Sequence, residues 1–302
     1  MASLDVTRLF SVKGYVAVVT GGSSGLGLMI SKGLVTNGAK VYVVALRSDP
    51  IEEVVKELNE LGKASGGSAV GMSCNLSMTY DIPKLARDIE EQEGCLDLLV
   101  SNAGIRRDPF EPCDVLTTDV LELQNSMASL SQRDWEDTFS VNVTAHYYLA
   151  VAFLPLLQRA TKPDEDGRPG SREGRGAVII TSSCASMHNL TNVDLTSYAA
   201  SKAATDHLVR LLAAKFREFY IRVVGLNPGF FPSRMNPIGK EGNVFSALFD
   251  KVPAKRAGQE EDIAGAVIYL ASRAGLTRKK SYVNGINLCI DGGRILVANG
   301  QE

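Results

Sequence analysis

The segment that decides the fold reads Tyr15-Val16-Ala17-Val18-Val19-Thr20-Gly21-Gly22-Ser23-Ser24-Gly25-Leu26-Gly27. A short β-branched run that ends in a glycine-rich turn predicts a buried parallel strand leading into a helix. Apolar residues then recur at helical spacing from Leu26 to Leu34. The pair Asn37-Gly38 predicts the end of that helix.

Three glycines of this turn have predicted structural roles. Gly21 allows a sharp turn, Gly25 lets the backbone approach a pyrophosphate, and Gly27 lets the helix lie close to the sheet. The N-terminus of the helix offers free N–H groups and the positive end of its dipole to phosphates. A tight turn without a ligand is the alternative, but the flanking strand and helix favour a nucleotide site.

The composition is typical of a globular protein and gives no sign of nucleic-acid or membrane binding. Of 302 residues, 45% are apolar and 22% are charged, with a formal net charge of −2. No signal pattern and no membrane-spanning stretch is present, so we expect a cytoplasmic protein. Five scattered cysteines have neither metal-ligand nor disulfide-framework spacing, which indicates a reducing compartment and no metal site: Cys74, Cys95, Cys113, Cys184 and Cys289.

Strand and helix patterns alternate along nearly the whole chain. They predict an α/β fold of one domain over residues 1–302, a Rossmann-like, doubly wound parallel sheet of about seven strands with helices on both faces. Two insertions interrupt it near 106–130, where 115–123 forms a helical turn or two, and 160–176, a charged surface loop. Further strands are expected at 40–46, 68–73, 96–100, 177–181, 221–226 and 286–290, and further helices at 51–61, 82–93, 132–158, 197–216 and 262–271.

A tyrosine and a lysine open the helix expected at 197–216. Tyr198 and Lys202 are four residues apart and therefore project from the same helix face. An ammonium near a phenol favours the phenolate and lowers the phenol pKa from about 10, which makes Tyr198 a usable acid or base. An ordinary surface pair is the alternative for these two residues.

Other polar residues gather at the strand carboxyl ends, the edge at which ligands bind in such sheets. Ser182 and Ser183 follow the strand at 177–181, and Asn142 lies in the long helix. With these motifs the chain resembles the short-chain dehydrogenase/reductase family from about Leu9 to Gly293. It is most similar to the 3-oxoacyl reductase branch, on the motifs Thr20–Gly27, Ser101-Asn102-Ala103-Gly104, Ser197–Lys202 and Asn227-Pro228-Gly229-Phe230-Phe231-Pro232-Ser233-Arg234-Met235.

The resemblance implies a hydride-transfer site. Tyr198 would be the general acid, Lys202 would hold the nicotinamide ribose and lower the Tyr198 pKa, and Ser183 would orient the carbonyl. Asn142 would position a water that relays protons to the lysine. A dinucleotide would be lined by Thr20, Gly21, Ser23, Ser24, Gly25, Leu26, Gly27, Arg47, Asn75, Leu76, Asn102, Ala103, Gly104, Tyr198, Lys202, Pro228, Gly229, Phe231 and Ser233.

The chain departs from the family pattern at several positions. Ser101 replaces an asparagine that braces a strand, and Asn75 replaces an aspartate that contacts adenine. The interval between Ser183 and Tyr198 is slightly long, so Ser182 is an alternative to Ser183. His188 lies in that interval, as a second base or, in the favoured interpretation, a loop histidine.

The end of the second strand predicts the cofactor. NAD-dependent enzymes carry a carboxylate there for the ribose 2′-hydroxyl, whereas arginine accommodates a 2′-phosphate. Leu46 stands at the acidic position and Arg47 follows it, which favours NADP(H). Two features oppose this prediction: Asp49 lies close by, and Ser24 stands where many NADP-dependent relatives have a basic residue.

Residues 229–252 predict an apolar wall or lid over the site, with a helix packed on a neighbouring subunit as the alternative. We therefore expect an NADPH-dependent carbonyl reductase that acts on an apolar ketone, 3-oxoacyl or polyketide-like, and a homotetramer or homodimer built through the helices around Asn142 and Tyr198. Arg234 or Arg106 is a candidate for an anionic substrate group. The alternatives are an NAD-dependent secondary alcohol dehydrogenase and a catalytically inactive nucleotide-binding scaffold or sensor.

Overall fold

The computed structural model describes residues 4–114, 117–163, 170, 174–187, 195–237, 252–275 and 282–298. Its centre is a parallel sheet in the order β3-β2-β1-β4-β5-β6-β7. The strands are β1 (Val16–Thr20), β2 (Lys40–Ala45), β3 (Ser68–Ser73), β4 (Leu98–Ser101), β5 (Ala177–Thr181), β6 (Arg222–Pro228) and β7 (Asn287–Ile290). The predicted α/β Rossmann-like sheet is confirmed, with strand bounds within two residues of those expected.

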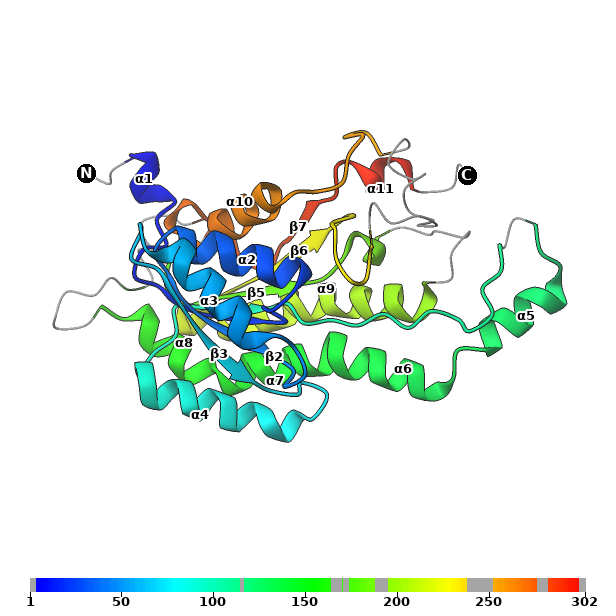
Figure 1. The fold of residues 1–302 in the computed structure, drawn as a ribbon, viewed down its shortest axis with the longest axis horizontal. Helices are drawn as coiled ribbons and strands as arrows, with labels where there is room; N and C mark the ends of the chain where they lie inside the picture. Colours follow the sequence, from blue (N-terminus) through cyan, green and yellow to red (C-terminus); the bar gives the residue numbers. More distant parts are fainter. Residues whose placement is uncertain are drawn as a thin grey trace.

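Helices cover both faces of the sheet (Figure 1). They are α1 (Val6–Leu9), α2 (Gly25–Thr36), α3 (Ile51–Gly62), α4 (Ile82–Glu93), α5 (Val120–Ala128), α6 (Gln132–Phe139), α7 (Ala145–Ala152), α8 (Leu154–Thr161), α9 (Thr196–Phe216), α10 (Glu260–Ala271) and α11 (Arg294–Val297). Short 3₁₀ turns lie at Thr79–Asp81, Cys184–Ser186, Arg217–Phe219 and Arg273–Gly275.

The buried side chains form two cores because successive strand residues point to opposite faces. In β1, Val18 packs with α4, α7, α8 and α9, whereas Ala17 and Val19 pack with α2, α3 and α10. From β1 the chain adds β2 and β3 on one side of the sheet and then β4 to β7 on the other side. The strand order therefore reverses between β1 and β4. That reversal opens the crevice in which doubly wound sheets bind their ligands.

The helix expected over 132–158 is wrong as one continuous element. A single π-helical turn, Ser140–Thr144, separates α6 from α7. The chain then bends by 53° between Gln132–Ala152 and α8, which has a proline in its first turn. Pro155 has no backbone N–H to continue the hydrogen-bond ladder, which accounts for the bend.

The described part of the first expected insertion lies away from the sheet centre. This insertion contains α5, which lies at the outer end of α6 (Figure 1). Helical turns were expected over 115–123, but α5 begins only at Val120. Residues 115 and 116 lie outside the described residues, as does most of the second insertion.

Candidate active site

The glycine turn between β1 and α2 leaves no room for side chains at its critical positions. Gly21 and Gly25 have φ angles of 64° and 52°, a region that favours glycine. A Cβ on Gly27 would lie 2.1 Å from the carbonyl oxygen of Gly21. The close packing of α2 on the turn, predicted from the sequence, therefore requires glycine at position 27.

A hydrogen-bond cluster joins this turn to the end of β4. The Thr20 hydroxyl oxygen accepts from the backbone N–H groups of Asn102 at 2.9 Å and Ala103 at 3.1 Å. The Asn102 amide donates back to the carbonyl oxygen of Thr20 at 3.0 Å. These bonds fix the two strand ends on either side of the crevice.

Unpaired polar groups around the turn fit a dinucleotide. Ser23 is 4% exposed, and its hydroxyl has no hydrogen-bond partner among the described residues; nor has the Asn102 side-chain oxygen. Ser24 is the N-cap of α2, but its side chain makes no capping bond. Buried polar groups are costly to leave unpaired, and a helix N-terminus attracts anions, so this cradle suits a pyrophosphate and the ribose beside it.

Tyr198 and Lys202 project from the first turns of α9 toward the same crevice. The Lys202 ammonium lies 5.7 Å from the centroid of the Tyr198 ring and donates to the carbonyl oxygen of Thr181 at 2.9 Å. A Cβ placed on Gly104 would lie 3.4 Å from the same ammonium. The ends of β4 and β5 and the start of α9 therefore meet at Lys202.

Burial determines the direction in which the pKa of Tyr198 is shifted. Desolvation raises its pKa above the usual 10.0, and this outweighs a hydrogen bond with Ser183 and the positive charge of Arg106, both of which lower it. The Lys202 ammonium donates to the carbonyl oxygen of Thr181, and the lowering of the Tyr198 pKa by Lys202 stays a prediction. Tyr198 is consequently protonated at neutral pH and has a proton to give.

Lys202 is itself strongly affected by its surroundings. It is 2% exposed, and desolvation lowers its pKa from 10.5 to about 8, although the negative charge of Asp206 opposes this shift. Asp206 is buried one helical turn beyond Lys202, and both its carboxylate oxygens accept from the Asn227 amide at 3.1 Å. Asp206 was not predicted, although its spacing from Lys202 on one helix face was a usable signal.

The two serines after β5 have different neighbours. Ser182 donates to the carbonyl oxygen of Lys202 at 3.0 Å and so faces the helix backbone. Ser183 hydrogen-bonds with Tyr198. Ser183 is thus the serine beside the phenol, which favours it over Ser182 for the predicted role.

Asn142 lies at the centre of the π-helical turn. Its side-chain oxygen accepts from the backbone N–H of Ile105 at 2.9 Å, and its amide donates to the carbonyl oxygen of Ile105 at 2.9 Å and to Ser201 at 3.0 Å. Asn142 therefore connects the segment after β4 to α9, next to Lys202. A π-helical turn inside a helix frequently marks a functional position.

A buried histidine behind the site was not predicted. His146 is 1% exposed, and its Nδ1 lies 2.6 Å from the hydroxyl of Ser101. Desolvation and the charge of Lys202 lower its pKa well below 6.5, so it is neutral. Ser101, the departure that left a bracing bond in doubt, is therefore braced by His146. The partners are 45 residues apart, and no local sequence pattern links them.

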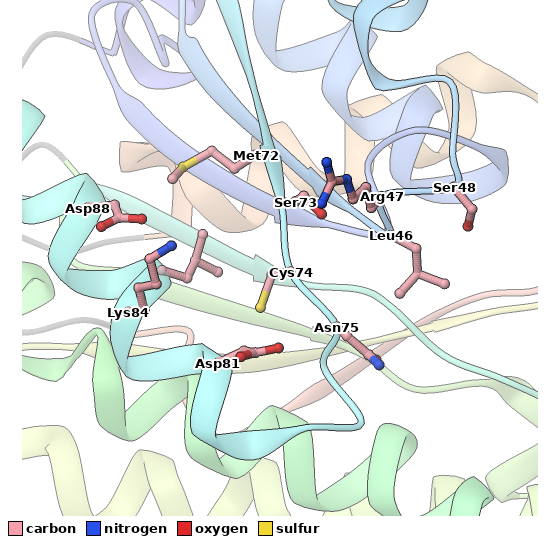
Figure 2. Close-up of a pocket in the computed structure, with 11 residues that line it drawn as sticks. Leu46, Arg47, Ser48, Met72, Ser73, Cys74, Asn75, Asp81, Lys84 and Asp88 are labelled. Carbon is pink, nitrogen blue, oxygen red and sulfur yellow. The ribbon is translucent and has the colours of Figure 1, made fainter.

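The ends of β2 and β3 open into a cavity of about 480 Å³ (Figure 2). The predicted cofactor residues Arg47 and Asn75 line it, while Leu76 is buried beside them with 7% exposure. Its remaining wall consists of Leu46, Ser48, Met72, Ser73, Cys74, Asp81, Lys84, Leu85 and Asp88. The Asn75 side-chain oxygen accepts from the hydroxyl and backbone N–H of Ser77, which leaves its amide group to contact a ligand.

The segment after β6 lies across the glycine turn. A Cβ on Gly25 would be 3.1 Å from the Cβ of Ser233, which places this predicted contact residue on the turn. Gly229 packs on Asp291, and Phe231 is 2% exposed in the core, so Phe231 can offer only its backbone to a cofactor. His188 and residues 238–251 of the expected lid lie outside the described residues.

Comparison with known proteins decides the family. Residues 15–241 match the family model described as short chain dehydrogenase. The chain belongs to the short-chain dehydrogenase/reductase family. It is 35% identical to the short-chain dehydrogenase/reductase PhomF of Diaporthe leptostromiformis, over 98% of this chain and 96% of that protein. It is 28% identical to the 5-keto-D-gluconate 5-reductase of Escherichia coli K12, over 95% and 98%.

Among solved structures, the chain is similar to Pseudomonas aeruginosa RhlG in a complex with NADP. The TM-score is 0.76 at 30% identity, over 96% of this chain and 99% of that one. This short-chain dehydrogenase/reductase is therefore an NAD(P)-dependent oxidoreductase acting on CH–OH and C=O groups.

No single helix among the described residues is long and apolar enough to cross a membrane; the bent pair Gln132–Ala152 and Leu154–Thr161 meets the requirement only by length and composition. In the same residues, no cluster of three His, Cys, Asp or Glu side chains could hold a metal ion.

Proposed function

We propose that this enzyme is an NADPH-dependent carbonyl reductase that converts an apolar ketone, 3-oxoacyl or polyketide-like, into a secondary alcohol. The choice of NADPH rests on the two residues that follow β2, Leu46 and Arg47. Leu46, 47% exposed, offers no acceptor to a ribose hydroxyl, and Arg47 beside it offers a planar fork of donors to a 2′-phosphate. The NADP in the RhlG structure is consistent with this choice.

The chemistry divides between cofactor and side chains. A bound nicotinamide nucleotide supplies the hydride that reduces the carbonyl carbon. Ser183 donates a hydrogen bond to the substrate oxygen, and Tyr198 gives that oxygen its proton as negative charge develops. The raised pKa of Tyr198 keeps the proton available at neutral pH.

Lys202 and Asn142 replace the proton that Tyr198 gives away. The ammonium of Lys202, with its pKa of about 8, stabilises the transient phenolate and holds the nicotinamide ribose. Asn142, bonded to the segment after β4 and to α9, fixes the geometry behind the lysine. A water held there would carry protons from solvent to Lys202.

The apolar substrate class rests on the residues that follow the Asn227-Pro228-Gly229 motif. Phe230 and Phe231 begin this segment and line a second cavity of about 250 Å³ with Val252, Ala254 and Ile290. The charged residues Arg256, Asp262 and Asp291 also line this cavity. The E. coli relative is named for a polar sugar acid, so a matched pair of apolar and sugar-acid ketones distinguishes the two substrate classes.

The second candidate is an NAD-dependent secondary alcohol dehydrogenase. One observation favours it: the carboxylate of Asp49 accepts a hydrogen bond from the backbone N–H of Leu46 at 3.2 Å, close to where a ribose hydroxyl would lie. A carboxylate there is the usual mark of NAD preference.

We also propose a cytoplasmic, single-domain homo-oligomer assembled through α7 and α9. Tyr147, Tyr148 and Val151 of α7 and Leu211 of α9 are each more than 40% exposed, which is costly for large apolar groups unless a partner covers them. Light scattering at micromolar concentration tests this: a monomer contradicts it.

A panel of ketones with NADPH and NADH tests the proposed function. The panel should contain 3-oxoacyl thioesters, aromatic polyketide-like ketones and 5-keto-D-gluconate, with loss of absorbance at 340 nm as the readout. We expect turnover of apolar ketones with NADPH. Turnover with NADH alone supports the second candidate, and turnover of only the sugar acid refutes the apolar substrate class.

A further inference from the structure

An arginine from the substrate-side segment reaches the cofactor end of the site. Arg234 follows β6, yet its guanidinium donates to the Ser24 hydroxyl at 2.8 Å and to the Asp49 carboxylate at 3.2 Å. These three residues come from the segment after β6, the glycine turn and the loop after β2. Ser24 is the position at which the sequence lacked a basic residue, and Arg234 brings a positive charge to it.

The Asp49 carboxylate accepts hydrogen bonds from a backbone N–H group and from a guanidinium. One of its oxygens accepts from the Leu46 N–H at 3.2 Å, and the other accepts from Arg234. The Asp49 side chain is only 13% exposed, whereas that of Arg234 is 72% exposed. A carboxylate therefore occupies a site, at the end of β2, where backbone and guanidinium donors both favour an anion.

The end of β2 is also where a bound dinucleotide places its ribose 2′ position. A 2′-phosphate has more negative charge than a carboxylate and three acceptor oxygens, and the arginine fork matches phosphate geometry. We propose that Arg234 and Ser24 hold the 2′-phosphate together with Arg47, and that Asp49 holds the guanidinium in place until the phosphate replaces the carboxylate. This inference rests on the proposed preference for NADPH.

The position of Arg234 connects cofactor choice to the substrate side. Its neighbour Ser233 contacts Gly25 of the turn, and Asn236 of the same segment accepts from Arg106, the arginine whose charge acts on Tyr198. A 2′-phosphate held by Arg234 thereby holds residues 230–237 across the turn and beside the catalytic tyrosine.

The test measures binding alone and uses two nucleotide fragments, 2′,5′-ADP and 5′-AMP, which differ by the 2′-phosphate. Isothermal titration is performed on the wild type, Arg234→Gln, Asp49→Asn and the control Arg133→Gln. Arg133 is 76% exposed and pairs with one carboxylate, Asp137, at 3.0 Å, so it matches Arg234 in exposure and pairing.

We expect Arg234→Gln to weaken 2′,5′-ADP binding about tenfold or more, the size of a lost charged hydrogen bond, and to leave 5′-AMP binding unchanged. Asp49→Asn should tighten 2′,5′-ADP binding because the competing carboxylate is gone. The control Arg133→Gln should change neither.

The outcomes separate this inference from the proposed function. If the wild type prefers 2′,5′-ADP and Arg234→Gln retains that preference, the role of Arg234 is overturned while NADPH preference stands. If Asp49→Asn weakens 5′-AMP binding, Asp49 is a ribose acceptor and the exchange is overturned. If the wild type shows no preference for 2′,5′-ADP, the NADPH preference itself fails.

Discussion

Replacing Lys202 with methionine should abolish reduction and at the same time stabilise the fold at neutral pH. The pKa of Lys202 falls from 10.5 to about 8 on folding because the ammonium loses its solvent. About 2.5 units at about 1.4 kcal/mol each make the buried charge cost roughly 3 kcal/mol near pH 7. Methionine fills a similar volume without a charge, but it loses the bond to Thr181, worth about 1–2 kcal/mol. The net gain in unfolding free energy is roughly 1–2 kcal/mol.

The pH dependence identifies the cause of this gain. Above pH 8 the folded protein gives up the Lys202 proton while the unfolded chain keeps it up to 10.5, so wild-type stability rises with pH in this window relative to the variant. The advantage of Lys202→Met should shrink by about 1 kcal/mol between pH 8 and pH 9.

Urea titrations at pH 7, 8 and 9 without nucleotide measure the effect. Lys215→Met, an exposed lysine of the same helix α9, is the matched control and should change stability by less than about 0.5 kcal/mol at each pH. A Lys202→Met variant less stable than the wild type at pH 7, or a difference that does not vary with pH, would show that the buried Lys202 charge does not destabilise the fold.

Three further predictions concern the site. Tyr198→Phe should lower ketone reduction by about 10²–10⁴-fold and leave the NADPH dissociation constant, measured by fluorescence, unchanged; retained turnover excludes Tyr198 as the acid. Gly27→Ala should lower the melting temperature and abolish nucleotide binding, because its Cβ would lie 2.1 Å from a carbonyl oxygen, whereas Gly265→Ala, with nothing within 4 Å, should be neutral or stabilising. His146→Leu should cost about 1–3 kcal/mol in urea titrations by leaving the Ser101 hydroxyl unpaired, and adding Ser101→Ala should restore part of it; strictly additive losses would show that the pair is not coupled.

The sequence predicted what short-range patterns encode. The β-branched run before Thr20 gave the first strand, and the glycine turn gave its connection to α2. Tyr198 and Lys202 share a helix face because of their spacing alone, and the structure brings both to the end of β5. Repetition of the βα unit was enough to predict the parallel sheet.

Features set by tertiary contacts were not predictable in this way. The π-helical turn at Asn142 accompanies bonds to Ile105, 37 residues away, and helical periodicity gave no sign of it. The bend before Pro155 did have a local signal, which the expected long helix ignored. The raised pKa of Tyr198 depends on the solvent lost around it, which spacing cannot report.

The most direct test of the central claim, that Tyr198, Lys202 and Ser183 form a site for hydride transfer to a ketone, is isotope transfer. NADPH carrying two deuterium atoms at the reactive C4 position is incubated with the enzyme and an apolar ketone, and the alcohol is analysed by mass spectrometry. We expect one deuterium, bonded to the carbinol carbon, in each alcohol molecule. Alcohol without deuterium, or no alcohol from any ketone although the enzyme binds NADPH, would contradict it.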